Sequence, residues 1–187
     1  MYHIKQDKRS HASAKLIVDG LLHCLKEKKF NEITITDIHK ASTVGRSTFY
    51  RLFDCTEDII QYKCDQELQE VFENYIKFEP ENLANIIYYL IQYWVRNSTI
   101  LEILVQINRI DILCTSHYKF LNQIKEVYIG EPCLSSDKID YRISILTYTI
   151  IGVLRTWILR GKKESKEDLY LIFKENITST PELVFDA

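Results

Sequence analysis

Residues that break helices are rare in this chain, which has 5 Gly and 3 Pro among its 187 residues. Because Gly and Pro disfavour a helix interior most strongly, their scarcity favours long helices. Apolar residues recur every three or four positions along nearly every segment, and no segment shows the sustained alternation of a strand. With 46% hydrophobic residues, the composition is not that of a disordered or collagen-like protein. We therefore predict an all-α fold of about nine helices.

The predicted helices are separated by short breaks. Pro80 is expected to end one helix, and the Gly-Glu-Pro sequence at 130–132 predicts a turn. The helices are expected at about residues 9–28, 35–42, 46–53, 54–77, 83–94 and 99–113, then a segment up to about 129, then 137–160 and a last segment after Ser165. In the first helix, the leucines at positions 16, 21, 22 and 25 form the expected apolar stripe.

Several polar residues have the spacing of helix caps. Thr34 is followed three positions later by Asp37, which predicts a reciprocal capping box at the start of the second helix. Asp54 and Ser165 are expected to begin two later helices, and Gly161 is expected to end the helix before Ser165.

Charge is distributed unevenly along the chain, although the total of −2 gives no sign of a nucleic-acid partner. Residues 1–53 contain ten basic and five acidic residues, a net of +5, so the remainder carries −7. This split is what a basic N-terminal region (head) followed by a larger acidic region (body) would show. It disappears when the head is extended to Glu70, so charge alone does not identify a function.

The sequence offers no signature of catalysis, metal binding or a cofactor. It has no GxSxG, HExxH or phosphate-binding glycine loop, and His23 and Cys24, being adjacent on a helix, point apart. Five scattered cysteines without a CxxC spacing, together with a polar N-terminal segment, predict a reduced, cytoplasmic protein. The missing catalytic motifs predict no enzymatic activity. The most apolar stretch, 145–154, is about half a membrane span, so no membrane partner is predicted.

Two short helices joined at residues 43–45 suggest a helix-turn-helix. The run ITDIHKASTVGRSTFYRLFDCTEDI at 35–59, with the Thr before it, resembles the DNA-binding domain of the TetR family of bacterial regulators. The upstream segment LIVDGLLHCLKEKKF is similar to that domain's first helix. The matching positions are Thr34, Ile38, Val44, Arg46, Thr48, Phe49, Tyr50, Phe53 and Glu57.

The resemblance implies double-stranded DNA as a partner, and the residue chemistry agrees with it. Arg can read the guanine edge in the major groove, while Ser, Thr and Tyr hydroxyls can hold phosphates. Phe49 and Phe53 are expected to anchor the recognition helix. On an arbitrary helix the same residues would be ordinary solvated charges and caps. The expected DNA-contacting residues are Thr34, Thr36, Gly45, Arg46, Ser47, Thr48, Tyr50, Arg51 and Thr56, with Lys8 and Arg9 in a flexible arm before the first helix.

Three positions depart from the family pattern. Thr43 occupies the place of a usual Gly, so we expect Gly45 to supply the flexibility of the turn. Leu52 and Thr56 replace residues that commonly contact the DNA backbone, and their loss would flatten the salt dependence of binding.

The remainder of the chain is expected to form an effector and dimerisation domain, giving domains at 1–55 and 56–187. The segment YRISILTYTIIGVLRTWILRG at 141–161 is similar to C-terminal regions of such regulators in Firmicutes, in which the last two long helices of each protomer usually pair. Its apolar positions have a coiled-coil-like spacing, and the alternative is that they face the protomer's own core. The residues expected at a homodimer interface are Ile150, Val153, Trp157, Leu169 and Phe173.

An effector site is expected among the aromatic residues of this second domain, although most of them are ordinary core residues. A small aromatic or apolar ligand would suit such a lining. The function expected from the resemblance is a ligand-responsive repressor acting as a homodimer on a palindromic operator. The alternative is an interaction module or co-activator of the same fold, with weakened DNA binding, that acts through a partner protein. The candidate effector residues are Tyr89, Tyr93, Gln106, Arg109, Tyr118 and Tyr148.

Overall fold

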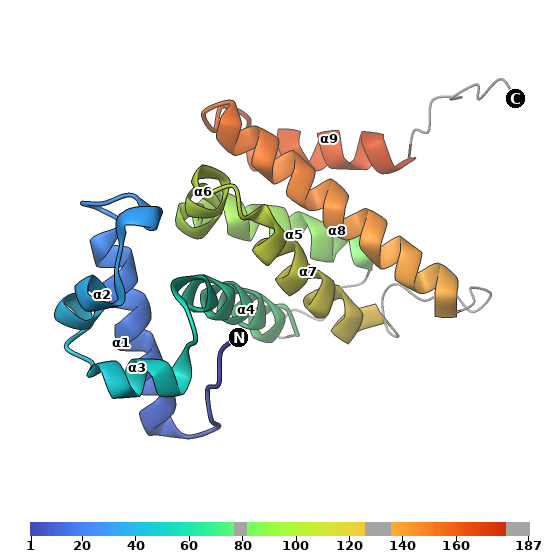
Figure 1. The fold of residues 1–187 in the computed structure, drawn as a ribbon. Coiled ribbons are helices and arrows are strands. Elements are labelled where there is room, and N and C mark those ends of the chain that lie inside the picture. Colours follow the sequence, from blue (N-terminus) through green and yellow to red (C-terminus); the bar gives the residue numbers. More distant parts are fainter. Residues whose placement is uncertain (77–81, 126–135, 179–187) are drawn as a thin grey trace, which may run out of the picture. The chain divides into compact units, whose positions relative to one another are not determined.

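The computed structural model describes residues 1–76, 82–125 and 136–178, and within these residues the all-α prediction is confirmed. The predicted helix end at Pro80 and the predicted turn at 130–132 lie outside the described residues. The described part contains nine α-helices: α1 (Lys8–Cys24), α2 (Ile35–Ser42), α3 (Arg46–Leu52), α4 (Thr56–Ile76), α5 (Leu83–Arg96), α6 (Thr99–Gln106), α7 (Ile110–Ile124), α8 (Ser136–Leu159) and α9 (Lys166–Thr178) (Figure 1).

The chain divides into two compact units, Met1–Glu67 and Leu68–Ala187, here called unit 1 and unit 2. Unit 1 extends past the expected boundary after residue 55 because the beginning of α4 packs within it. Tyr62 and Cys64 on α4 are buried, and the Tyr2 hydroxyl donates to Asp65 Oδ2 at 2.7 Å. The division therefore falls within a helix, where the spacing of apolar residues continues and gives no sign of a boundary.

Unit 1 has α1 packed across the helix-turn-helix formed by α2 and α3 (Figure 1). The expected position of Leu16 in the apolar stripe of α1 is wrong, because its side chain is 47% exposed. The inner face of α1 instead carries Ala14, Ile17, Val18, Leu21 and Cys24. Gly20 also lies on this face, and an added Cβ would come within 2.8 Å of Ser42 Cβ and 3.0 Å of the Ser42 nitrogen. Glycine at this position allows α1 and α2 to approach closely.

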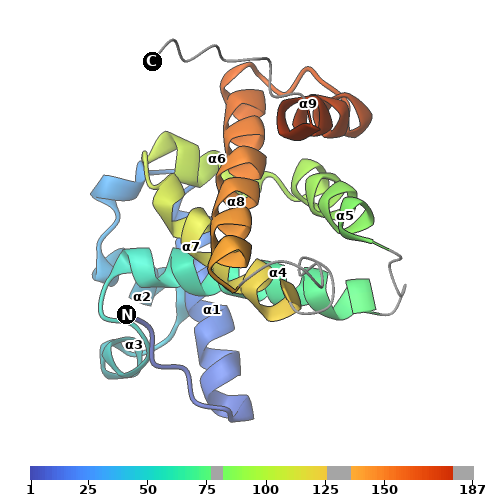
Figure 2. The same cartoon turned by 90° about the vertical axis from the view of Figure 1, so that its right-hand side faces the viewer.

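Unit 2 is a helical bundle in which α8 has α7 on one side and α5 and α9 on the other (Figure 2). Four of the residues expected at the dimer interface are buried within the protomer: Ile150, Trp157, Leu169 and Phe173. Val153 is half-buried. In the protomer, α8 and α9 use these four side chains to pack into their own bundle, and their place at a dimer interface stays a prediction.

The helix predicted at 99–113 is interrupted. Asn108 has a φ of 56° and separates α6 from α7, and Asn is one of the few residues that adopts this left-handed conformation readily. The first helix also ends earlier than expected, at Cys24, with turns continuing through Lys28. The predicted caps at Ser165 and Gly161 are confirmed: Ser165 exchanges hydrogen bonds with Asp168, and Gly161 has a φ of 81°.

Among the described residues, one helical segment, Lys138–Leu159, is long and apolar enough to cross a membrane by length and composition. The apolar character of this helix thus extends beyond the ten-residue stretch noted in the sequence. Its buried residues, among them Ile143, Leu146, Ile150 and Leu154, pack within the helical bundle of unit 2.

Candidate nucleic-acid interface

The first helix of the helix-turn-helix begins with the predicted capping box. The Thr34 hydroxyl donates to Asp37 Oδ2 at 2.7 Å and accepts from the Asp37 backbone N–H at 3.2 Å. The Lys28 ammonium lies 2.8 Å from Asp37 Oδ1, and Lys28 together with these hydrogen bonds holds the pKa of Asp37 well below its usual value. Because the Thr34 hydroxyl already donates its hydrogen bond to Asp37, the Thr34 side chain acts here as a helix cap.

The turn between α2 and α3 differs from expectation. Thr43 itself adopts the left-handed conformation, with φ 59° and ψ 6°, whereas Gly45 has an ordinary extended backbone. The expectation that Gly45 supplies the flexibility is therefore wrong, and a β-branched residue carries the strain. His39 and Ser42 hold the turn: Nδ1 of His39 donates to the Val44 carbonyl at 2.6 Å, and the Ser42 hydroxyl accepts from the Val44 N–H at 3.2 Å.

The recognition helix α3 has a buried side and a polar side. Phe49, Leu52 and Phe53 at its end are at most 2% exposed, which confirms that both aromatic residues anchor it. Leu52 is thus a core residue rather than a lost surface contact. Tyr50 is 57% exposed, although its ring also packs edge-on against Phe49. Four expected DNA-contacting residues are exposed on this helix, Arg46, Ser47, Tyr50 and Arg51, and Thr48 is half-buried.

Two of the expected DNA-contacting residues meet each other across the turn. The Arg46 guanidinium donates to the Thr36 hydroxyl at 2.8 Å, although the two residues are ten positions apart. This hydrogen bond holds an extended, flexible side chain in one orientation at the start of α3. It leaves the other guanidinium N–H groups available, because Arg carries five donors.

Residues expected at the edge of the interface are placed differently. Lys8 and Arg9 form the first turn of α1, where Asp7 accepts hydrogen bonds from the backbone N–H groups of Arg9 and Ser10. They are helical, so the expectation that they lie in a flexible arm is wrong. Thr56 is half-buried at the start of α4, and its hydroxyl donates to Glu57 Oε2 at 3.1 Å.

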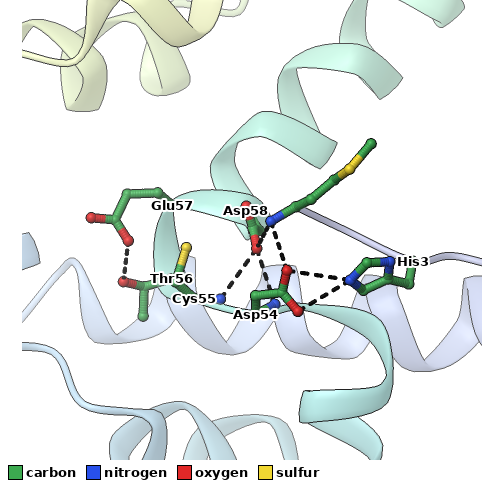
Figure 3. A network of polar contacts seen from close by, with 7 residues as sticks. His3, Asp54, Cys55, Thr56, Glu57 and Asp58 are labelled. Atoms are coloured by element: carbon green, nitrogen blue, oxygen red, sulfur yellow. Dashed lines mark hydrogen bonds and ion pairs between the residues drawn. The ribbon is translucent and has the colours of Figure 1, made fainter.

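The segment before α1 is bound to unit 1, which the sequence pattern did not predict. The His3 N–H donates to the Leu52 carbonyl at 2.8 Å, and Tyr2 forms an isolated bridge with Phe53. Asp54 was expected to cap α4, yet its carboxylate contacts His3 and the Met1 amino group (Figure 3). Asp58 instead accepts from the backbone N–H groups of residues 54 and 55.

The Met1 amino group is held by two carboxylates. It lies 2.7 Å from Asp58 Oδ2 and 2.9 Å from Asp54 Oδ2, and these hydrogen bonds raise its pKa to about 10. These contacts tie the N-terminus to the loop after α3 and to the start of α4 (Figure 3). They connect residues more than fifty positions apart, so no local spacing could have indicated them.

The candidate effector residues of unit 2 do not form one site. Tyr118 and Tyr148 line an open groove between α7 and α8 with a volume of about 760 Å³. Four other candidates are not among the lining residues of that groove: Tyr89, Tyr93, Gln106 and Arg109. Arg109 binds Asp111 through two of its nitrogens, and the Tyr93 ring packs edge-on against Trp94.

The interior of unit 2 contains a polar pair that sequence reasoning did not single out. The Trp94 indole N–H donates to Nε2 of His117 at 2.9 Å. His117 is fully buried, and burial lowers its pKa to about 3, so the ring is neutral. Among the described residues, no group of three or more His, Cys, Asp or Glu side chains is arranged to hold a metal ion.

Solved structures share the fold of this chain at low sequence identity. A TetR transcriptional regulator from Streptococcus agalactiae superposes with a TM-score of 0.61 at 17% identity, covering 92% of this chain and 97% of that chain. A TetR-family regulator from Syntrophomonas wolfei gives 0.64 at 16%, covering 92% and 98%. The dihydroxyacetone kinase operon activator DhaS gives 0.58 at 16%, covering 88% and 93%.

Sequence comparison reaches the same family from the second unit. No curated protein matches the chain in sequence. A TetR-type family model described as a transcriptional regulator C-terminal region matches residues 81–179, which is more than half of the chain. The helix-turn-helix of unit 1 and this C-terminal match agree, and the chain belongs to the TetR family of transcriptional regulators.

Proposed function

We propose that this TetR-family regulator reads a palindromic DNA operator as a homodimer and is a ligand-responsive repressor. The observation that carries the proposal is the polar side of α3, where Arg46, Ser47, Tyr50 and Arg51 are exposed above a buried apolar anchor. The tightly packed inner side of α3 holds the helix rigidly in unit 1. Its exposed side chains are of the types that contact bases and phosphates.

Arg46 is the proposed base-reading residue. In the free protein it donates to the Thr36 hydroxyl. On DNA, the remaining guanidinium donors would chelate a guanine edge while Thr36 maintains the orientation. The hydroxyls of Ser47 and Tyr50 and the charge of Arg51 would hold the flanking phosphates.

Homodimerisation is proposed through a different set of residues from those first expected. Gly152 lies exposed within α8, and an added Cβ there would meet nothing within 4 Å in the protomer. A glycine costs a helix interior about 1 kcal/mol relative to Ala, and the protomer's packing gives no reason for it. A closely approaching partner helix would give such a reason. Exposed apolar residues lie near it, Tyr148 and Leu159 on α8 and Leu171 and Ile172 on α9, together with the exposed Arg155 and Arg160 of α8.

One observation supports a second candidate function, an interaction module with weakened DNA binding. The Thr56 hydroxyl donates to the Glu57 carboxylate, so the start of α4 places a negative charge where phosphate is expected to approach. In that case binding would show almost no salt dependence, because each phosphate contact contributes about 0.9 to the slope of log K against log salt. The name of DhaS, an operon activator, supports activation as an alternative to repression.

The test is DNA binding by the purified full chain, using a sequence enriched from a random library and fluorescence anisotropy. Arg46→Ala should weaken binding by roughly 10- to 100-fold and relax preference at one base pair, because a bidentate contact contributes about 1–3 kcal/mol. Arg96→Ala, an exposed arginine of α5 in unit 2, is the matched control and should change neither. Unchanged affinity in the Arg46 variant would refute its assignment, and a salt slope near zero would favour the interaction module.

A further inference from the structure

The groove between α7 and α8 has the dimensions of a ligand site. Its volume of about 760 Å³ lies within the usual range for small-molecule pockets. Tyr118 from α7 and Tyr148 from α8 line it, and both rings are substantially exposed, at 38% and 66%. Neither ring is needed to fill the protomer's core, so both offer faces to a planar partner.

Thr147 on α8 gives a second, independent sign of a ligand. Its side chain lines the groove, is 1% exposed, and its Oγ1 has no hydrogen-bond partner among the described residues. Nearby hydroxyls are satisfied within their own helices: Ser144 donates to the Asp140 carbonyl at 3.0 Å, and Thr156 donates to the Gly152 carbonyl at 2.8 Å. A buried hydroxyl without a partner is costly, so a group that reaches it from the groove would offset this cost.

The charges around the groove favour an anion. Lys119 and Arg155 contribute two cations to its lining. Asp111 is the carboxylate among the lining residues, and Arg109 already binds it at 3.0 Å and lowers its pKa. Arg155 therefore places a positive charge in the groove beside two aromatic rings.

We propose that the α7–α8 groove binds a small aromatic carboxylate, whose ring contacts Tyr118 and Tyr148 and whose carboxylate accepts the Thr147 hydroxyl and faces Arg155. This inference deepens the ligand response of the proposed function, on which its regulatory meaning rests. Gly152 lines both this groove and the adjoining α8–α9 groove, so a ligand here would touch the helix proposed to meet the partner protomer.

The experiment measures binding of 1-naphthoate and its neutral analogue 1-naphthamide to the purified full chain, without DNA, by calorimetry. We expect naphthoate to bind and naphthamide to bind at least about 10-fold more weakly. Thr147→Val, which removes only the hydroxyl, should lower naphthoate affinity by about 10-fold or more. Without ligand it should melt no lower than the wild type, because an unpartnered buried hydroxyl is lost. Arg155→Gln should reduce the preference for naphthoate over naphthamide.

Thr156→Val is the matched control, since its hydroxyl is satisfied by Gly152 and it does not line this groove. Its naphthoate affinity should equal that of the wild type. The proposal is overturned if naphthoate does not bind the wild type, if Thr147→Val binds it equally well, or if Thr147→Val melts lower without ligand than Thr156→Val. Because no DNA is present, any of these failures leaves the test of DNA reading by Arg46 unaffected.

Discussion

Two helical glycines show how the two units differ. Gly20 in unit 1 is buried, and Ser42 and the Ile38 carbonyl surround the space where a side chain would stand. Gly152 in unit 2 is exposed, and nothing in the protomer lies within 4 Å of an added Cβ. The first glycine is explained by contacts inside its own unit, and the second is not.

The same contrast holds for two threonines. The Thr34 hydroxyl both donates and accepts within a capping box, whereas the Thr147 hydroxyl is buried without a partner among the described residues. In unit 1, the unusual residues maintain the geometry of the proposed DNA-reading surface. In unit 2, we propose that the unexplained residues mark contacts with a ligand or a partner protomer.

Among the substitutions, the largest effect is expected at Gly20. Gly20→Val should destabilise unit 1 by about 3 kcal/mol, because its side chain would overlap the backbone of α2. Hydrogen exchange of α1 and α2 would measure the loss. The same change at Gly152 is the control and should leave folding of the protomer nearly unchanged. Equal destabilisation at both positions would remove the distinction between the two glycines.

Association of protomers tests Gly152 directly. Gly152→Phe should weaken dimerisation by roughly 100-fold, a cost of about 2.7 kcal/mol for a disrupted close contact. Sedimentation at several concentrations would measure the change, and circular dichroism would confirm that the helices persist. A dimer of unaltered affinity would mean that α8 does not approach a partner at this glycine.

The pH dependence of stability should differ between the units. In unit 2, His117 has a pKa of about 3 when folded and 6.5 as its reference value, so the unfolded state binds the additional proton. The free energy of unfolding should therefore fall as pH decreases from 6.5 towards 3, by up to about 1.4 kcal/mol per pH unit. In unit 1, Asp37 has a lowered pKa, so the stability it provides is lost only below its reference value of 3.8.

Tryptophan fluorescence separates these effects, because Trp94 and Trp157 are the two tryptophans of the chain and both belong to unit 2. In His117→Gln the amide oxygen can still accept the Trp94 N–H, but the side chain does not titrate. In this variant, the free energy of unfolding of unit 2 should no longer depend on pH above about 4. A slope equal to that of the wild type would show that His117 is not its source.

The smallest expected effect concerns the strained turn. Thr43→Gly should stabilise unit 1 by about 0.5–1 kcal/mol, because relief of the left-handed backbone exceeds the entropy cost of glycine. Asn108→Gly in unit 2 should gain less, because Asn tolerates this conformation. Urea denaturation followed by hydrogen exchange in each unit would compare the two. Destabilisation by Thr43→Gly would mean that the Thr43 side chain makes a stabilising contact that outweighs the strain of its backbone.

The sequence predicted most accurately what depends on near neighbours. The bounds of α2 and the capping box between Thr34 and Asp37 follow from residues three positions apart, and the structure confirms them. The coiled-coil-like spacing identified an apolar face of α8 but could not say which molecule covers it. Ile150 is fully buried and Ile145 is 59% exposed on the same helix, a difference that only packing determines.

Contacts over long separations could not be predicted. The segment at residues 1–3 binds the end of α3 and the start of α4 through side chains that follow no period. Likewise, Tyr89 and Tyr118 are both helical tyrosines, yet only Tyr118 lines the α7–α8 groove. The identity of aromatic residues limits a ligand's chemistry, whereas the folded bundle decides which of them it can reach.

We propose that two copies of unit 1 read one symmetric DNA site. The most direct measurement is native mass spectrometry of the full chain on DNA enriched from a random library. We expect an inverted repeat bound by two protomers, with binding lost when either half-site is scrambled. A single protomer on an asymmetric sequence, or the absence of any enriched sequence, would contradict it.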